Sequence, residues 1–229
     1  MIKNSYSALL IFVVLLNSCR QDQAQESIIY FNDFETSNTI LENKIDTSYT
    51  TYHNSSERFF EFNGSRNLGR FERGGITLEL EGIESHQFVK LEFDLYIHDN
   101  WEGNGARGNT EDVFILNVDE LNVHFSSIIN TKCLTQDCET VQSFPNRINV
   151  RDNPENAGVT SPTLPGVCFF EGEIGGTKLI QFSDLYPHSS NRLKVNIAAG
   201  IKDAGVDLCL KSWSIDNLRI TTVEMPNPR

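Results

Sequence analysis

The densest group of chemically useful side chains lies between Leu91 and Asp112. This stretch begins with the alternating apolar residues of a half-buried strand and continues as a polar loop with acids, glycines and one tryptophan. Loops held at the end of a rigid element commonly carry binding chemistry. We therefore predict that the loop takes part in the function, with Trp101, Glu102 and Asn104 as candidate ligand-binding residues.

Trp101 has two interpretations. An exposed tryptophan offers a flat apolar face to a sugar ring, whereas a buried one closes the end of a β-sandwich. Tryptophan is highly buried on average, which favours the second interpretation. Trp213 is predicted to pack inward, and the two-residue period of a strand places Asp216 on the opposite side of that strand or near its end.

Nucleophilic catalysis has no support in the sequence. The pattern Gly-x-Ser-x-Gly, which presents a serine nucleophile at a sharp turn, does not occur. The histidines stand singly and are predicted to be surface or packed side chains: His53, His86, His98, His124 and His188.

Glu92-Phe93-Asp94 resembles the start of the strand motif Glu-x-Asp-x-Glu or Glu-x-Asp-x-x-Glu of retaining glycosidases with concanavalin-like sandwiches. That mechanism needs a second carboxyl group about 5 Å from the nucleophile. The positions at which the motif would place it hold Tyr96 and Ile97. We therefore expect Glu92 and Asp94 to be exposed residues of a half-buried strand rather than catalytic groups.

The N-terminus has the pattern of an export signal. Lys3 precedes nine apolar residues, Ala8 to Leu16, a run too short to span a bilayer. Leu16-Asn17-Ser18-Cys19 resembles the lipobox of bacterial lipoproteins, which implies cleavage after residue 18 and lipidation of Cys19. Residues 19–27 then form a polar tether. The expected location is the bacterial cell envelope, with the domain anchored to a membrane by lipid.

Charge and cysteine content narrow the partners and the compartment. The formal net charge of -12 disfavours nucleic acid and suits metal cations or neutral ligands. Apart from Cys19, an even number of cysteines remains, which favours disulfides in an exported protein. Three pairings are possible, and we favour Cys168 with Cys209 and Cys133 with Cys138.

The rest of the chain predicts one all-β domain over residues 28–223, followed by a tail at residues 224–229. Short runs of β-branched and aromatic residues alternate with Gly, Asn, Asp and Pro, which is typical of an antiparallel sandwich or barrel. We expect an antiparallel β-sandwich. The predicted strands are Ile28–Phe34, Arg58–Asn63, Ile76–Glu81, Phe88–His98, Asp112–Val118, Leu121–Ser127, Val167–Glu171, Lys178–Phe182, Arg192–Ala198 and Ser212–Thr222.

Several short motifs follow one another along the chain. Asp-Phe-Glu at Asp33–Glu35, Phe-Asp-Leu-Tyr at Phe93–Tyr96 and Ile-Asp-Asn-Leu at Ile215–Leu218 together resemble MAM domains and related jelly-roll carbohydrate-binding modules.

A second set of motifs resembles more closely the LamG-like modules of exported bacterial proteins. It comprises Phe93–Tyr96, an Asp-x-Trp-x-Gly loop at Asp99–Gly103, Asp112 at the start of the next strand, Pro187–His188 and Ser-Trp-x-Ile-Asp-Asn at Ser212–Asn217. The resemblance implies a jelly roll of the concanavalin/LamG-like or galactose-binding-like kind.

The resemblance implies a structural calcium ion near the first and last strands. Calcium is bound by six to eight oxygen atoms, which carboxylates from separate segments can supply. Glu35 and Asp216 are the best candidates, and Asp99 and Asp112 either complete that site or form another. The alternative is that these acids cap turns and remain solvated.

We expect a lipid-anchored, non-catalytic module for binding or adhesion, with a glycan as its ligand. The alternatives are a polysaccharide hydrolase or lyase with a sandwich fold, and a structural envelope protein that contacts other proteins.

Overall fold

The computed structural model describes eight parts of the chain. The predicted signal peptide, Cys19, Cys133 and Cys138 lie outside them, so the predictions of lipidation and of a second disulfide stay predictions. In the described parts, no helix is long and apolar enough to cross a membrane. The described ranges are 23–36, 44–46, 51–52, 58–104, 112–132, 141–150, 152–202 and 209–226.

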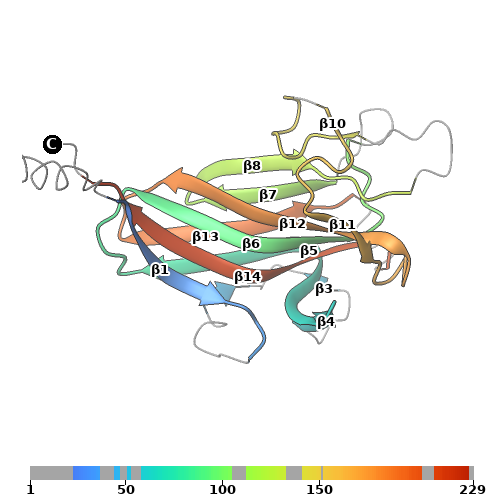
Figure 1. The fold of residues 1–229 in the computed structure, drawn as a ribbon, viewed down its shortest axis with the longest axis horizontal. Helices are drawn as coiled ribbons and strands as arrows, with labels where there is room; N and C mark the ends of the chain where they lie inside the picture. The colour runs from blue at the N-terminus through green and yellow to red at the C-terminus, as the bar shows by residue number, and fades with distance from the viewer. Residues whose placement is uncertain are drawn as a thin grey trace, which may run out of the picture.

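The described residues form an all-β structure, as predicted, and the pairings between named strands are antiparallel. Figure 1 shows the long strands running along the length of the molecule. The strands are β1 (Gln25–Asn32), β2 (Ile45–Asp46), β3 (Thr51–Tyr52), β4 (Phe59–Phe62), β5 (Ser65–Glu81), β6 (Phe88–Asp99), β7 (Val113–Val118), β8 (Leu121–Ser127), β9 (Val141–Gln142), β10 (Asn153–Pro154), β11 (Ser161–Pro165), β12 (Ile174–Pro187), β13 (Arg192–Gly200) and β14 (Lys211–Glu224).

The strands form two sheets of a sandwich that share β5. The first sheet has the order β11-β12-β6-β14, and β14 is flanked by β1 along one part of its length and by the start of β5 along another. The second sheet continues from the end of β5 through β13 and β7 to β8. The expected antiparallel β-sandwich is confirmed (Figure 1).

The core lies between the inner faces of the two sheets. In β6 the residues Leu91, Phe93 and Leu95 are buried, while the residues between them are half-buried on the outer face. β13 shows the same alternation with buried Leu193 and Val195. Each such side chain stabilises the fold by about 1.5–3 kcal/mol through burial of apolar surface.

Glycines explain why β5 is longer than the predicted strand, which began only at Ile76. β5 begins at Ser65 and passes from the first sheet to the second through Gly74 and Gly75. Gly74 has a φ of 77°, and a Cβ on Gly75 would lie 2.2 Å from the carbonyl oxygen of Ile197. Only residues without a side chain fit this close crossing.

Several strand boundaries differ from the prediction, and one predicted strand does not form. The predicted strand Val167–Glu171 is wrong, because this segment forms turns held by a disulfide and by a buried carboxylate described below. At the N-terminus, pairing with β14 begins at Gln25, opposite Glu224, rather than at Ile28.

Candidate functional site

A bulge in β14 shapes the outer face of the first sheet. Ile215 and Leu218 both point into the core although three positions separate them, and the pairing with β6 shifts between Asp216 and Arg219. Asn217 adopts a φ of 54°, a left-handed conformation that asparagine tolerates better than most residues. The bulge therefore brings Asp216 and Asn217 to the outer face as neighbours.

An open groove of about 400 Å³ follows this outer face. It crosses β12, β6 and β14 and ends at β1. The residues that line it supply carboxylates, amides, a hydroxyl group, a guanidinium group and the ring of Phe31, whereas the rings of Phe93 and Phe182 belong to the core. The lining residues are Phe31, Glu92, Phe93, Asp94, Gln181, Phe182, Ser183, Asn217 and Arg219.

Contacts within β6 and between neighbouring strands fix several of these groups. Asn217 Nδ2 donates to Asp94 Oδ2 at 2.8 Å, and Lys90 Nζ lies 2.8 Å from Glu92 Oε1. The guanidinium group of Arg219 lies over the ring of Phe31, 4.9 Å from its centroid. The groove therefore presents polar groups in defined positions, with one aromatic ring at its edge.

Two carboxylates and a hydroxyl group lie close together beside the groove, where β5 begins. Ser65 Oγ is 2.5 Å from Glu35 Oε1 and 2.5 Å from Asp216 Oδ2. A hydroxyl group has one hydrogen, so Ser65 donates to only one of the two acids. The other oxygen–oxygen contact requires a proton on a carboxyl group or a cation between the acids.

The two acids differ in their environment. Hydrogen bonds from Ser65 Oγ and then from the Arg66 amide lower the pKa of the exposed Glu35. Burial raises the pKa of Asp216 to about 6, and the charge of Asp94 adds to the effect. Asp216 is therefore the acid that more readily holds the additional proton.

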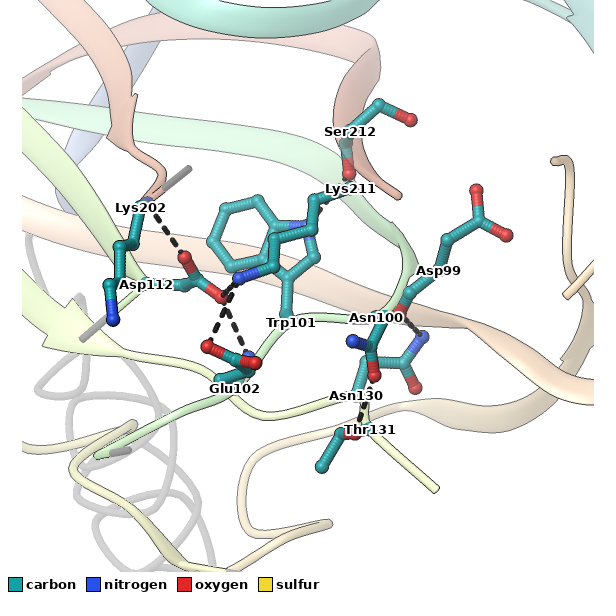
Figure 2. A network of polar contacts seen from close by, with 10 residues as sticks. All are labelled: Asp99, Asn100, Trp101, Glu102, Asp112, Asn130, Thr131, Lys202, Lys211 and Ser212. Carbon is teal, nitrogen blue, oxygen red and sulfur yellow. Dashed lines mark hydrogen bonds and ion pairs between the residues drawn. The ribbon is translucent and has the colours of Figure 1, made fainter. Parts of the chain in front are cut away.

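Trp101, in the described part of the central loop, belongs to the core. Its side chain has no exposed surface, and its Nε1 donates to the Ser212 carbonyl oxygen at 2.9 Å (Figure 2). This burial favours the interpretation of Trp101 as a plug, and its role as a ligand-binding residue stays a prediction.

Asp112 is held in a buried ion-pair network (Figure 2). Lys211 Nζ lies 3.0 Å from Asp112 Oδ2 and 3.2 Å from Glu102 Oε2, and the amides of Glu102 and Lys202 donate to the Asp112 carboxylate. Burial raises the pKa of Asp112, while the Lys211 charge is the largest cause acting in the opposite direction. The network joins the central loop to the start of β14.

Asp99 fixes a different loop. Its Oδ1 accepts hydrogen bonds from the amides of Val167, Cys168 and Phe170 at 3.0–3.3 Å. Burial raises its pKa, and these hydrogen bonds act against that rise. Cys168 forms a disulfide with Cys209, which confirms the favoured pairing.

Asp99 and Asp112 do not complete a metal site with Glu35 and Asp216. Figure 2 shows the Asp99 carboxylate directed away from the Asp112 network, and each acid already has amide or lysine partners. Among the described residues, no group of three or more His, Cys, Asp or Glu side chains is arranged to hold a metal ion. Of the four predicted calcium ligands, the structure brings together only Glu35 and Asp216.

Asn104 and Glu102 also have structural partners. Asn104 Nδ2 donates to Asp152 Oδ1 at 2.6 Å, and its Oδ1 accepts a hydrogen bond from Ser127. These contacts hold the irregular segment that follows β8. Glu102 remains partly exposed beside Lys211.

The groove residues contributed by β1, β12 and β14 were missed in the sequence. A signal for the bulge was present, because the three-residue spacing of Ile215 and Leu218 breaks the two-residue period of a strand. No comparable signal marked Phe31, Gln181 or Arg219, since their proximity depends on which strands become neighbours.

Comparison with known proteins does not identify a family for this chain. No protein-family model and no curated protein matches the chain, so the LamG-like and MAM-like resemblance stays a prediction. Among solved structures, the chain is similar to basic winged bean lectin, in a crystal structure with Tn-antigen. That match has a TM-score of 0.36 and 10% identity, and it covers 90% of this chain and 100% of the lectin chain. At this score the likeness carries no argument about the ligand, and the fold rests on the strand pairing above.

Proposed function

We propose that the protein is a lipid-anchored module of the bacterial cell envelope that binds a neutral glycan in the groove across β12, β6 and β14. The groove is the single observation that carries the proposal. It combines hydrogen-bond acceptors, donors and an aromatic edge on one exposed face. Sugars require this combination, because each hydroxyl group both donates and accepts, while the ring faces are apolar.

The charge of the groove favours neutral over anionic glycans. Glu92 and Asp94 contribute carboxylates, and Asp216 lies beside them opposite Asp94. Arg219 is the basic residue of the lining, and its guanidinium group is engaged with Phe31. A uronate or sulfate placed there would meet more negative than positive charge.

Membrane attachment is the second part of the proposal. It rests on the predicted export signal and lipobox, together with the position of β1. The chain enters the sandwich at Gln25, beside the end of β14, while the groove lies on the outer face of the first sheet. A tether that reaches this end would leave the groove free for an adhesive contact.

Binding to a panel of polysaccharides tests the function. The full chain should be retained by at least one neutral polysaccharide and not by polyuronates or sulfated polymers. Asn217→Ala together with Gln181→Ala should weaken retention at least tenfold, because two groove amides are removed. Glu79→Gln, on an exposed residue of the second sheet, is the matched control. Failure of the unaltered chain to bind any polymer would reject the proposal.

We also propose that calcium binds between Glu35 and Asp216. A cation there would satisfy the two acids that share the single hydrogen of Ser65. Calcium should raise the melting temperature of the unaltered chain and chelator should reverse the rise, because a ligand specific for the folded state stabilises it. Asp216→Asn should abolish this response, and Glu120→Gln, on an exposed acid in the turn between β7 and β8, should retain it. An identical melting temperature in calcium and in chelator would exclude this ion.

A hydrolase is the second candidate function, favoured by one observation. Asp94 and Asp216 are direct partners across β6 and β14, and Cβ atoms of such partners lie about 4.5–5.5 Å apart. Their carboxyl groups therefore start from neighbouring positions on one face of the sheet, and retaining glycosidases use two carboxyl groups about 5 Å apart. Release of reducing ends from the bound polysaccharide, lost in Asp94→Asn, would establish hydrolysis. Binding without product would leave the module non-catalytic.

A further inference from the structure

Two histidines form a separate titratable cluster at the end of the sandwich where β1 begins and β14 ends. His86 lies in the connection from β5 to β6, and His188 lies in the connection from β12 to β13. The rings are nearly parallel, with centroids 4.9 Å apart, and both residues are buried. The glycan groove and the acids beside it do not include them.

The four ring nitrogens make a continuous chain of contacts. His86 Nδ1 lies 2.7 Å from the Glu84 carbonyl oxygen, and His86 Nε2 lies 2.6 Å from His188 Nδ1. His188 Nε2 lies 3.0 Å from the Arg192 carbonyl oxygen and 3.3 Å from Asp119 Oδ2. Both ends of the chain therefore meet oxygen atoms that only accept hydrogen bonds.

The contacts in this chain need one hydrogen more than two neutral rings carry. The two carbonyl contacts each require an N–H group, and the contact between the rings requires one more. Three ring protons are needed, whereas two neutral imidazoles carry only two. We propose that His86 and His188 share one imidazolium charge, with Asp119 as its counter-ion. This inference is independent of the proposed glycan function.

The charged groups around the pair support a positive charge at this position. Asp119 contacts His188 from the turn between β7 and β8, and its other oxygen accepts from the Lys194 amide. The remaining nearby side chains are exposed and mostly balanced: Arg192 pairs with Glu81, Lys194 pairs with Glu79, and Glu84 is exposed beside His86. Asp119 is thus the acid in contact with a ring.

The shared proton makes the pair a latch between the two sheets. Each connection that carries a histidine runs from one sheet to the other, because β5 and β13 pair with each other in the second sheet while β6 and β12 pair in the first. Without the third proton, one of the three contacts would lack a hydrogen.

Nitrogen-15 NMR of the histidine side chains in the unaltered full chain tests the proton count directly. At pH 7, we expect three of the four ring nitrogens of His86 and His188 to carry hydrogen. Two protonated nitrogens, one for each ring, would overturn the proposal. This measurement requires no variant, so it does not depend on the folding of an altered chain.

Removal of the counter-ion provides the second test. Asp119→Asn keeps an oxygen acceptor and removes the negative charge beside the shared proton, so urea unfolding at pH 7 should show a larger loss of stability than in Glu81→Gln, the control on an exposed acid. Equal urea midpoints in Asp119→Asn and Glu81→Gln would overturn the latch.

Discussion

Single buried charges decide what the central loop does. Lys211 and Asp112 are almost completely buried and lie 3.0 Å apart, and their contacts join the loop to β14. A buried ion pair adds little net stability over an apolar pair of similar size, but removal of one partner leaves the other charge uncompensated. Asp112 and Glu102, at the two ends of the loop, therefore stabilise the fold through their contacts with Lys211.

Lys211→Met should lower the free energy of unfolding by about 3–5 kcal/mol, because Asp112 would remain as a buried, unpaired acid. Glu102→Gln removes the partly exposed partner and should cost less than about 1 kcal/mol. Urea unfolding of both variants measures the difference. Similar losses in the two variants would contradict the assignment of Asp112 as the main partner.

His98 should make the folded protein less stable at low pH. It is buried, its ring nitrogens contact Thr177 Oγ1 and Ser214 Oγ, and the rings of Phe60 and Phe62 lie against it. Burial, and then the charge of Arg70, lower its pKa well below the ordinary value. The folded state therefore resists a proton that the unfolded chain accepts.

Stability should fall as pH decreases below about 6.5, the pKa of an unfolded histidine, because the unfolded state then binds more protons. His98→Gln should be less stable at pH 8 and should lose less stability between pH 6.5 and pH 5. Denaturant unfolding at a series of pH values gives both slopes. The same dependence of stability on pH in His98→Gln and in the unaltered chain would show that His98 does not cause the loss of stability at low pH.

At the scale of elements, the bulge in β14 and the turns before β12 place side chains in positions that regular strands do not allow. The bulge presents Asp216 and Asn217 side by side and adjusts the phase of the strand so that Leu218 still reaches the core. The turns before β12 are closed by Asp99 and by the Cys168–Cys209 disulfide. The bulge positions the groove. The turns before β12 close the end of the sandwich at which Asp99 lies.

Asn217 should show the cost of the left-handed conformation separately from its hydrogen bond. Both Asn217→Gly and Asn217→Ala remove the contact with Asp94, but only alanine is strained at positive φ. The glycine variant should therefore be the more stable of the two by about 1 kcal/mol, as measured by chemical unfolding. Equal stabilities would mean that the bulge imposes no such strain.

The contribution of the disulfide to stability should depend on the length of the chain segment that it closes. Its cysteines are separated by 41 positions, for which restriction of the unfolded chain predicts a contribution of about 4 kcal/mol at most. Replacing both cysteines by serine should lower stability by about 2–4 kcal/mol, measured by urea unfolding against the oxidised chain. An unchanged urea midpoint would show that the disulfide does not contribute to stability.

At the scale of the whole molecule, local patterns predicted the sandwich well and the site poorly. Alternation around Leu91 and Leu193 identified the core faces, because burial follows the period of a strand. The convergence of Phe31, Gln181 and Arg219 depends on strand order, which short-range patterns do not contain. The burial of Asp112 was not predicted, because its lysine partner, Lys211, lies about a hundred positions further along the chain.

The central claim is that the outer face of the first sheet binds a neutral glycan. A titration of the nitrogen-15-labelled full chain with a neutral oligosaccharide, selected from the polysaccharide panel, tests it most directly by NMR. We predict that the side-chain amide signals of Gln181 and Asn217 and the backbone signals of β6 and β14 will shift together. Shifts confined to β13, β7 and β8, with the groove signals unchanged, would contradict the account.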